Sequence, residues 1–470
     1  MIMNRYAIFL LSMICLLASG CMQSESSKAD ADLLVYARKV AVDCFDSSYA
    51  LLASDLLFGQ SAEQHGGEVI WNQWIHRSDF PTPPLRERWA DMDRLISMAY
   101  LNLRGGAICV VVPQETDRRF AIQGFDHHGN SLGYMTDLDA AGKVLLLTHA
   151  SDKSSYPDSA YCVIKYPSWA GFARLTIPAS YDPESTADLA VAQAMQAGFV
   201  LDPHESSSTS SSYATQRVLP YPSGVTSVAE HLLRMDCWQH LDDLLSVMQS
   251  DSTTYPDATK IYNRLFNLRK SDLDASILEQ IDHEIELGYD EVNAKLQDDI
   301  ADNPFIDYKN GWSYYKDISD FTTPYYRSFL MMTSPMPDEA QELMTFYVTK
   351  DKDELSLDGS LGSYTMLYTL DELPDVLGYW SLGVYDNEGY LIPNDYQRYN
   401  LNSQRNNLHF NRDEGSLTLY LSPTPPIEPE HYANWLPIPR APFQLVMRVA
   451  QPTADYLSMG VMVKPFVVRR

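Results

Sequence analysis

The stretch "YWSLGVYDNEGYLIPNDYQRY", Tyr379–Tyr399, shows at its start the two-residue alternation of a half-buried β-strand. One face of that strand would be apolar, with Trp380, Leu382 and Val384. The opposite face would be aromatic and polar, with Tyr379, Ser381, Gly383 and Tyr385. The residues Asp386–Gly389 then predict a turn, with glycine where a positive φ is needed, and Tyr390–Ile392 would return as the partner strand. The stretch therefore predicts a β-hairpin with two unlike faces.

The same alternation recurs in both halves of the chain. "GAICVVVP" places Ile108, Val110 and Val112 on one face, "SLTLYLSP" does so for Leu417, Leu419 and Leu421, and "FQLVMRV" for Phe443, Leu445, Met447 and Val449. Helical periodicity is found from Ala29 to Phe58, behind a capping box of Ser227 and Glu230, and from about Asp272 to Ile300. We predict a mainly β (α+β) protein whose two sheet cores are separated by helices.

The N-terminus is typical of a secreted, lipid-bearing protein. Arg5 precedes an apolar run from Ala7 to Ala18, which is too short to span a bilayer and has the length of a signal-peptide core. The run ends in "LLASGC", which resembles the bacterial lipobox and predicts cleavage of residues 1–20 and acylation of Cys21. An ordinary cleaved signal or an uncleaved anchor are the alternatives. Residues 21–28 would form a polar tether, and Met22 after the cysteine favours the outer membrane facing the periplasm.

Composition restricts the class of partner. Sixty-two acidic and 35 basic residues give a formal net charge of −27, which argues against nucleic acid and against an anionic lipid surface as partners. The contents of 30 Tyr, 8 Trp and 27 Pro favour a β-rich architecture with many turns. At 470 residues the chain can form two or three domains.

Four cysteines remain once Cys15 is removed with the signal and Cys21 carries lipid: Cys44, Cys109, Cys162 and Cys237. They allow three full disulfide pairings, and free buried thiols or a single disulfide are the alternatives. None lies close in sequence to another cysteine or a histidine in a zinc-ligand spacing, so we expect no zinc site.

The longest motifs carry a resemblance. "GYWSLGVYDNEGYLIPNDYQRYNL", "DEGSLTLYLSP" and "NWLPIPRAPFQLVMRV" resemble the signature blocks of the bacterial family called domain of unknown function 1214. Upstream, "WADMDRLISMAYLNLRGGAICVVVPQETDRRFAIQGFD" and "KYPSWAGF" resemble its usual N-terminal companion, domain of unknown function 1254. The resemblance implies two successive antiparallel, jelly-roll-like β-sandwiches joined by a helical segment, and self-association with a trimer as the expected form. The corresponding expected division is a first domain at 29–220, a helical segment at 221–301 and a second domain at 302–470.

One family block is altered. Where the first domain usually has Asn-x-Asp-Thr-Leu-Tyr-Ser, this chain has Asp91-Met92-Asp93-Arg94-Leu95-Ile96-Ser97. If the block lines a site, Arg94 in place of a small hydroxyl fills or recharges it, so a relative's activity does not carry over.

The candidate binding residues belong to two places. Asp126, in "GFDHHGN", matches a family position, and a second group combines amides, a guanidinium and rings: Tyr385, Asn394, Arg398, Tyr399, Asn434 and Trp435. The alternative is that these groups satisfy backbone atoms and lock hairpins together. His127 and His128 are adjacent and would share a metal only at a turn, and Asp351–Gly359 lacks the pattern of a calcium loop. We therefore expect neither a metal nor a cofactor.

No nucleophile elbow, phosphate loop or H-E-x-x-H motif occurs in the sequence. The sequence therefore favours a membrane-anchored envelope lipoprotein that binds or assembles, with a small-molecule or glycan ligand. The alternative is an envelope enzyme acting on a small organic or glycan substrate, in a pocket lined by the hairpin that starts at Tyr379.

Overall fold

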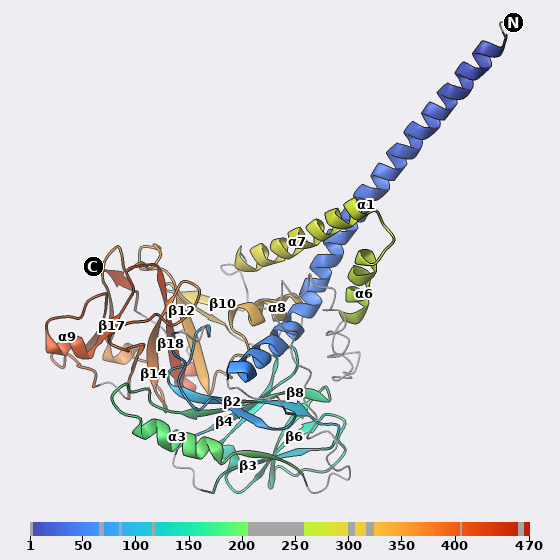
Figure 1. The fold of residues 1–470 in the computed structure, drawn as a ribbon. Coiled ribbons are helices and arrows are strands. Elements are labelled where there is room, and N and C mark those ends of the chain that lie inside the picture. Colours follow the sequence, from blue (N-terminus) through green and yellow to red (C-terminus); the bar gives the residue numbers. More distant parts are fainter. Residues whose placement is uncertain are drawn as a thin grey trace.

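The computed structural model describes residues 3–64, 70–83, 87–114, 118–204, 258–298, 306–315, 324–404, 407–458 and 465–470. Side chains are described from Lys28 onward, except at helix positions 60–64, 258–259, 261–262, 293, 296–298, 324–326 and 332–333. Within the described residues the chain is mainly β, with two β domains and helices between and beside them (Figure 1). This confirms the fold class predicted from the periodicity. The predicted helix behind Ser227 and Glu230, the serine tract Glu205–Ala214, and Cys237 lie outside the described residues.

The first sandwich consists of two sheets. One has the order β1-β2-β8-β4-β5 and the other β7-β6-β3-β9. The strands are β1 (Trp74–His76), β2 (Arg94–Asn102), β3 (Ile108–Val111), β4 (Ala121–Phe125), β5 (Ser131–Thr136), β6 (Val144–His149), β7 (Tyr161–Tyr166), β8 (Ala170–Pro178) and β9 (Val200–Pro203). Two helices accompany them, α2 (Asp137–Ala140) and α3 (Ala187–Ala197). Ile108 and Val110 face the core as predicted, and the strand ends at Val111.

The second sandwich has a six-stranded sheet, β10-β11-β12-β18-β14-β15, and a four-stranded sheet, β17-β16-β13-β19. Its strands are β10 (Ile306–Lys309), β11 (Trp312–Tyr315), β12 (Leu343–Val348), β13 (Tyr364–Thr369), β14 (Trp380–Asp386), β15 (Asn400–Asn402), β16 (Ser416–Ser422), β17 (Trp435–Pro437), β18 (Phe443–Ala450) and β19 (Val468–Arg469). Its short helices are α8 (Pro324–Thr333), η1 (Leu370–Glu372), α9 (Pro429–Ala433) and α10 (Ala454–Ser458). The predicted inward faces of β16 and β18 form its core.

Strand direction differs in one respect from the antiparallel expectation. Most pairs are antiparallel, but β6 and β7 run parallel, and so do β16 and β17. In each case a connection leads the chain across before the second strand begins. Residues 150–160 make the first crossover, and α9 lies within the second.

A long helix joins the two domains to a helical layer. Helix α1 runs from Met3 to Gln64, and α6 (Ala258–Arg269), α7 (Ala275–Asp298) and α8 pack beside it (Figure 1). The predicted face of the helix is formed by Leu33, Ala37, Val40, Cys44, Ser48 and Leu51. It is buried from Ala37 onward, with these residues at most 1 % exposed, and Leu33 is partly buried. Helix α7 agrees closely with the predicted range Asp272–Ile300, and its Gly288 lets the backbone of α1 approach near Arg38. The residues expected to form the tether, 21–28, are part of α1.

Within the described residues, no helix is both long and apolar enough to cross a membrane. The three described cysteines, Cys44, Cys109 and Cys162, are free thiols. Any full pairing of the four cysteines needs a bond between two of these three, so none of the three full pairings is present, and the free-thiol alternative holds for the described cysteines.

Candidate functional site

Strand β14, the start of the stretch quoted first, has two faces that belong to two cores. Its apolar face, with Trp380, Leu382 and Val384, is buried in the second sandwich as predicted. Its opposite face carries Tyr385, which packs with residues of the first sandwich's core, as do Tyr347 on β12 and Val446 on β18. The aromatic-polar face is therefore the joint between the two sandwiches.

The return strand predicted at Tyr390–Ile392 does not form. The turn forms as expected, with Gly389 at φ +93° and the N–H of Asp386 donating to Tyr390 O at 2.9 Å. The pairing stops after a single bridge between Tyr385 and Leu391, because Pro393 has no N–H with which to continue a ladder. At this edge of β14 the paired strand is β15, which runs antiparallel with Ser381 opposite Asn402.

Residues 87–94, which lead into β2, fill the joint from the side of the first sandwich. The N–H of Trp89 donates to Gly389 O at 2.6 Å, and its indole Nε1 donates to Gln444 Oε1 at 3.2 Å. The hydroxyl of Tyr385 donates to Ala90 O at 2.7 Å. Arg448 of β18 donates to the carbonyl of Trp89. The altered family block thus lies against the second sandwich.

Asp93 is the acceptor at the centre of this contact, and its side chain is buried. Its Oδ2 accepts the hydroxyl of Ser381 at 2.5 Å. Its Oδ1 accepts the side-chain amides of Asn400 at 2.8 Å and Asn402 at 2.9 Å. Three side chains on β14 and β15 therefore donate hydrogen bonds to one carboxylate of the first sandwich.

Charged side chains form a second layer, here called the interdomain charge cluster: Asp91, Arg94, Arg174, Asp338 and Arg448. Arg94 donates its Nε to Asp91 at 2.8 Å and its two terminal nitrogens to Asp338 at 2.9 and 3.0 Å. Arg174 donates to Asp338 at 2.7 Å and to Gln123 at 2.8 Å. All five side chains are buried, at no more than 11 % exposure.

Electrostatics in the cluster favour the ionised carboxylates. Burial alone would raise the pKa of Asp338, but the charges of Arg174 and Arg94 and the hydrogen bond from Arg94 lower it. For Asp91 burial again acts upward, and Arg94 and Arg448 together lower its pKa. The family departure is therefore explained: Arg94 fills the position of a small hydroxyl and makes ion pairs within its own sandwich and across the joint.

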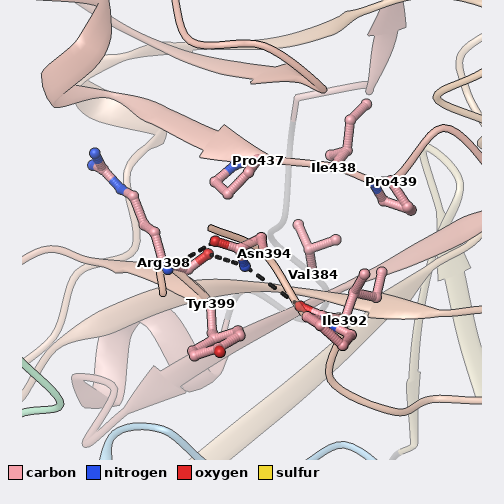
Figure 2. A pocket seen from close by; sticks show the side chains of 9 residues that line it. Val384, Ile392, Asn394, Arg398, Tyr399, Pro437, Ile438 and Pro439 are labelled. Carbon is pink, nitrogen blue, oxygen red and sulfur yellow. Dashed lines mark hydrogen bonds between the residues drawn. The ribbon is translucent and has the colours of Figure 1, made fainter. Parts of the chain in front are cut away.

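A hollow on the second sandwich collects three of the predicted residues. The proline-lined hollow is formed by Val384, Ile392, Pro393, Asn394, Arg398, Tyr399, Pro437, Ile438 and Pro439 (Figure 2). The centres of water molecules can occupy about 40 Å³ of the hollow, which gives room for roughly three waters. Its walls are apolar, and an amide and a guanidinium border them. It can take an uncharged group of a few atoms, such as one edge of a larger molecule.

The polar atoms around this hollow are bound to the chain's own backbone. Asn394 Oδ1 accepts the N–H of Tyr396 at 3.2 Å. The same oxygen accepts the N–H of Arg398 at 3.1 Å, and Asn394 Nδ2 donates to Arg398 O at 3.2 Å (Figure 2). The Arg398 guanidinium donates to Tyr432 O at 3.1 Å and Ala433 O at 2.8 Å, at the C-terminal end of α9. Its Nε–H is buried without an acceptor among the described residues.

The remaining predicted residues lie apart from the hollow's lining. Asn434 is buried; its Oδ1 accepts the N–H of His409 at 2.8 Å, and its Nδ2 donates to His409 O at 2.7 Å and Thr418 O at 2.9 Å. Trp435 is buried and donates to Ser422 O at 3.0 Å. Asp126 lies in the first sandwich, where its Oδ1 accepts the N–H groups of His128 and Asn130. The structure therefore brings Asn394, Arg398 and Tyr399 together, and places Asp126 in another domain.

Metal ligands do not converge in the part of the chain that the structure describes, where no group of three or more His, Cys, Asp and Glu side chains could hold an ion. In the acidic segment Asp351–Gly359, Asp351 Oδ1 accepts the N–H groups of Asp353 and Leu355. Asp358 Oδ1 accepts the N–H of Ser360 in the same way. These carboxylates shape turns.

Sequence reasoning missed the interdomain charge cluster. A usable signal was present, because Arg174 and Arg448 each interrupt an otherwise apolar strand, in "AGFARLTIP" and "FQLVMRVA". A charge within such a strand is rarely buried unless it is paired. The partner Asp338, 164 residues from Arg174, has no comparable signal in the sequence.

The fold and the contact between the domains define the class of protein. Two β-sandwiches are joined through a buried polar interface, and a long N-terminal helix packs beside them. A family model described as "Protein of unknown function (DUF1254)" matches residues 71–203, and one described as "Protein of unknown function (DUF1214)" matches residues 342–454. The chain belongs to the proteins that carry a DUF1254 domain followed by a DUF1214 domain, as its motifs indicated.

One solved structure supports the same fold. The crystal structure of the VPA0106 protein from Vibrio parahaemolyticus aligns with 92 % of this chain and 100 % of its own, with a TM-score of 0.59 and 16 % identity. A protein from Burkholderia cenocepacia aligns over 96 % of this chain and 97 % of its own, with a TM-score of 0.42 and 10 % identity. No curated protein matches the chain.

Proposed function

We propose that this protein is a cell-envelope lipoprotein, anchored through Cys21 in the outer membrane facing the periplasm, that binds an uncharged ligand or partner. The observation that carries the proposal is the continuity of α1. One helix leads from the region of the acylated cysteine into the body of the protein (Figure 1). A rigid spacer of this kind suits a domain that must stand clear of a lipid surface.

The dimensions of the spacer follow from the helix itself. Among the described side chains of α1, Ala37 is the first that is buried. Sixteen residues separate it from Cys21, which corresponds to about 24 Å of helix at 1.5 Å per residue. The net charge of −27 also repels the body from anionic lipid, so acyl chains rather than surface charge would hold it at the membrane.

The proposed binding surface is the proline-lined hollow. Its prolines and isoleucines offer fixed apolar walls. The ring of Tyr399 points away from these prolines and packs against Tyr181 of the first sandwich (Figure 2). Such walls favour the apolar face of a sugar or a small organic group over an ion. Asn394 and Arg398 hold the walls in place through the backbone contacts described above.

Lipidation is tested by labelling cells with radioactive palmitate. Wild-type protein should incorporate label and fractionate with the outer membrane, and Cys21→Ala should do neither. The matched control is Cys44→Ala, which removes a buried thiol of α1 and should leave labelling unchanged. Equal label in wild type and Cys21→Ala would refute the anchor.

Ligand binding is tested on protein lacking residues 1–21, screened by thermal shift against pools of neutral oligosaccharides and small organic compounds. A hit should lose affinity in Ile392→Ala and keep it in Ile427→Ala, an exposed isoleucine of the same domain. Chemical turnover of a hit, abolished in Ile392→Ala, would favour the enzyme alternative instead. A hit whose affinity is unaffected by Ile392→Ala would place binding elsewhere.

A further inference from the structure

A buried cluster of titratable side chains lies where α1 and α8 meet the first sandwich. The turn after β4 carries Asp126, His127 and His128, and both imidazoles are buried, at 0 % and 6 % exposure. Gly129 in this turn has φ +77°, and a side chain there would collide with the thioether of Met331 on α8. The turn is therefore pressed directly against the helical layer.

His127 connects the sheet to α1. Its Nε2 is hydrogen-bonded to the hydroxyl of Tyr100 on β2, which in turn donates to Asp55 Oδ1 of α1 at 3.3 Å. The rings of Tyr100 and of Phe172 on β8 lie 5.1 and 5.0 Å from the imidazole. Phe58, near the end of α1, packs on both of those rings, at 5.1 and 5.5 Å. The imidazole of His127 is thus part of the packing interface between α1 and the sheet.

Charges face the two imidazoles from each neighbouring element. Asp55 of α1 and Asp126 of the turn itself act on His127, together with a backbone contact at Ala170 and the neutral hydroxyl of Tyr100. Asp126 favours a protonated His128, whereas Arg327 of α8 and His127 oppose one. Burial is the largest effect for both residues, and it lowers the pKa of His127 and lowers that of His128 to about 4.

We propose that this cluster is an acid-sensitive joint, which releases α1 and α8 from the first sandwich when the surroundings are acidified. The geometry buries two imidazoles between α1, α8 and the first sandwich, where burial disfavours a protonated ring. Release lets both rings reach solvent and take up protons. The inference concerns the docking of α1 and does not depend on acylation of Cys21, so the two can fail separately.

The direction and size follow from linkage. A histidine whose folded pKa lies below its unfolded value contributes stability that is present above the unfolded pKa and is lost as pH falls. For His128, between an ordinary 6.5 and about 4, the equilibrium constant for release rises roughly 30-fold between pH 7.5 and pH 5. His127 acts in the same direction.

The test is hydrogen–deuterium exchange on the whole chain at pH 7.5 and pH 5, with rates corrected for intrinsic exchange. Burial raises the pKa of Asp46 on α1 to about 6, so its titration opposes that of the imidazoles. All chains compared, including the one called wild type below, therefore carry Asp46→Asn. Peptides of α1 covering residues 44–58 should lose protection by roughly 30-fold or more on acidification, and peptides of β16 should change far less. The variant His127→Gln/His128→Gln removes both titrations, so its protection should differ less than about 3-fold between the two pH values. His283→Gln, an exposed histidine of α7, is the matched control and should behave as wild type.

Two results would refute the acid-sensitive joint. One is equal exchange protection of α1 at both pH values in the wild type. The other is a double variant that loses as much protection at pH 5 as the wild type does. If the double variant does not fold, imidazole titration by NMR in the wild type decides. Rings of His127 and His128 that stay neutral until α1 loses protection support the proposal. Rings that protonate near pH 6.5 with α1 still protected refute it.

Discussion

Replacement of Asp338 by asparagine tests whether the interdomain charge cluster holds the two sandwiches together. Asp338 receives two hydrogen bonds from Arg94 and one from Arg174, all between 2.7 and 3.0 Å. Asp338→Asn keeps the shape of the side chain but removes its charge. Arg94 still pairs with Asp91, whereas the buried guanidinium of Arg174 loses its carboxylate partner. Breaking a buried ion pair from one side costs about 3–5 kcal/mol, so we expect a loss of that size in the free energy of unfolding.

The assay is urea unfolding followed by tryptophan fluorescence and far-ultraviolet circular dichroism. Because the cluster couples the sandwiches, the wild type should unfold with coincident transitions by the two probes, and Asp338→Asn should unfold earlier and in separated steps. Glu354→Gln is the matched control. It removes an exposed carboxylate that lies 3.6 Å from Lys350, and such pairs contribute about 1 kcal/mol or less.

The pH dependence gives a second check on the same reasoning. The folded pKa of Asp338 is lowered, so its contribution is present above the ordinary aspartate pKa and is lost only as pH falls through the lowered value. The difference between wild type and Asp338→Asn should therefore be constant from about pH 5 to 8. A midpoint shift no larger than that of Glu354→Gln, or one that varies over this range, would refute the role assigned to the cluster.

Two further changes have expected outcomes. Burial raises the pKa of Asp46 on α1 to about 6, and the cost of ionising it in the folded state is felt only above the ordinary pKa. Because Asp46 is partly exposed, Asp46→Asn should stabilise the fold by about 1–2 kcal/mol at pH 7.5. The gain should shrink as the pH falls below about 6, the folded pKa of Asp46. An unchanged melting temperature at pH 7.5 would contradict this. Asn434→Ala removes three hydrogen bonds from a buried amide to backbone groups of His409 and Thr418 and should cost about 2–4 kcal/mol in urea unfolding; a loss below about 1 kcal/mol would show that water replaces the amide.

Periodicity identified the strands and helices whose faces obey a simple rule. Leu417, Leu419 and Leu421 are all fully buried on one face of β16, as the alternation predicts. The helical stripe of α1 is buried for the same reason, since a seam of apolar residues must be covered by something. Such patterns are local, so a single sequence contains them in full.

Alternation misled the prediction where both faces of a strand are covered. On β18 the expected inward residues are buried, but Gln444, Val446 and Arg448 between them are buried as well. The first sandwich covers that second face, and no pattern within β18 announces a neighbour from another domain. The aromatic-polar face of β14 is covered for the same reason, since Tyr385 packs in the first sandwich's core.

The candidate binding residues divide in a similar way. Motif resemblance placed Asn394, Arg398 and Tyr399 near one another, and in the structure they border one hollow. Resemblance says nothing about which atoms of a side chain are already engaged. The amide of Asn434, for example, is fully used on His409 and Thr418, which lie 25 and 16 residues away.

The spacing of residues along the chain already encodes the elements of this protein: two sets of alternating strands, the helices α1 and α7, and the motifs of two known domains. How the sandwiches meet depends instead on pairs such as Arg94 with Asp338, which are 244 residues apart and come together only in the folded chain. Secondary structure follows from spacing along the chain, whereas a buried ion pair becomes favourable only when folding removes water from both partners at once.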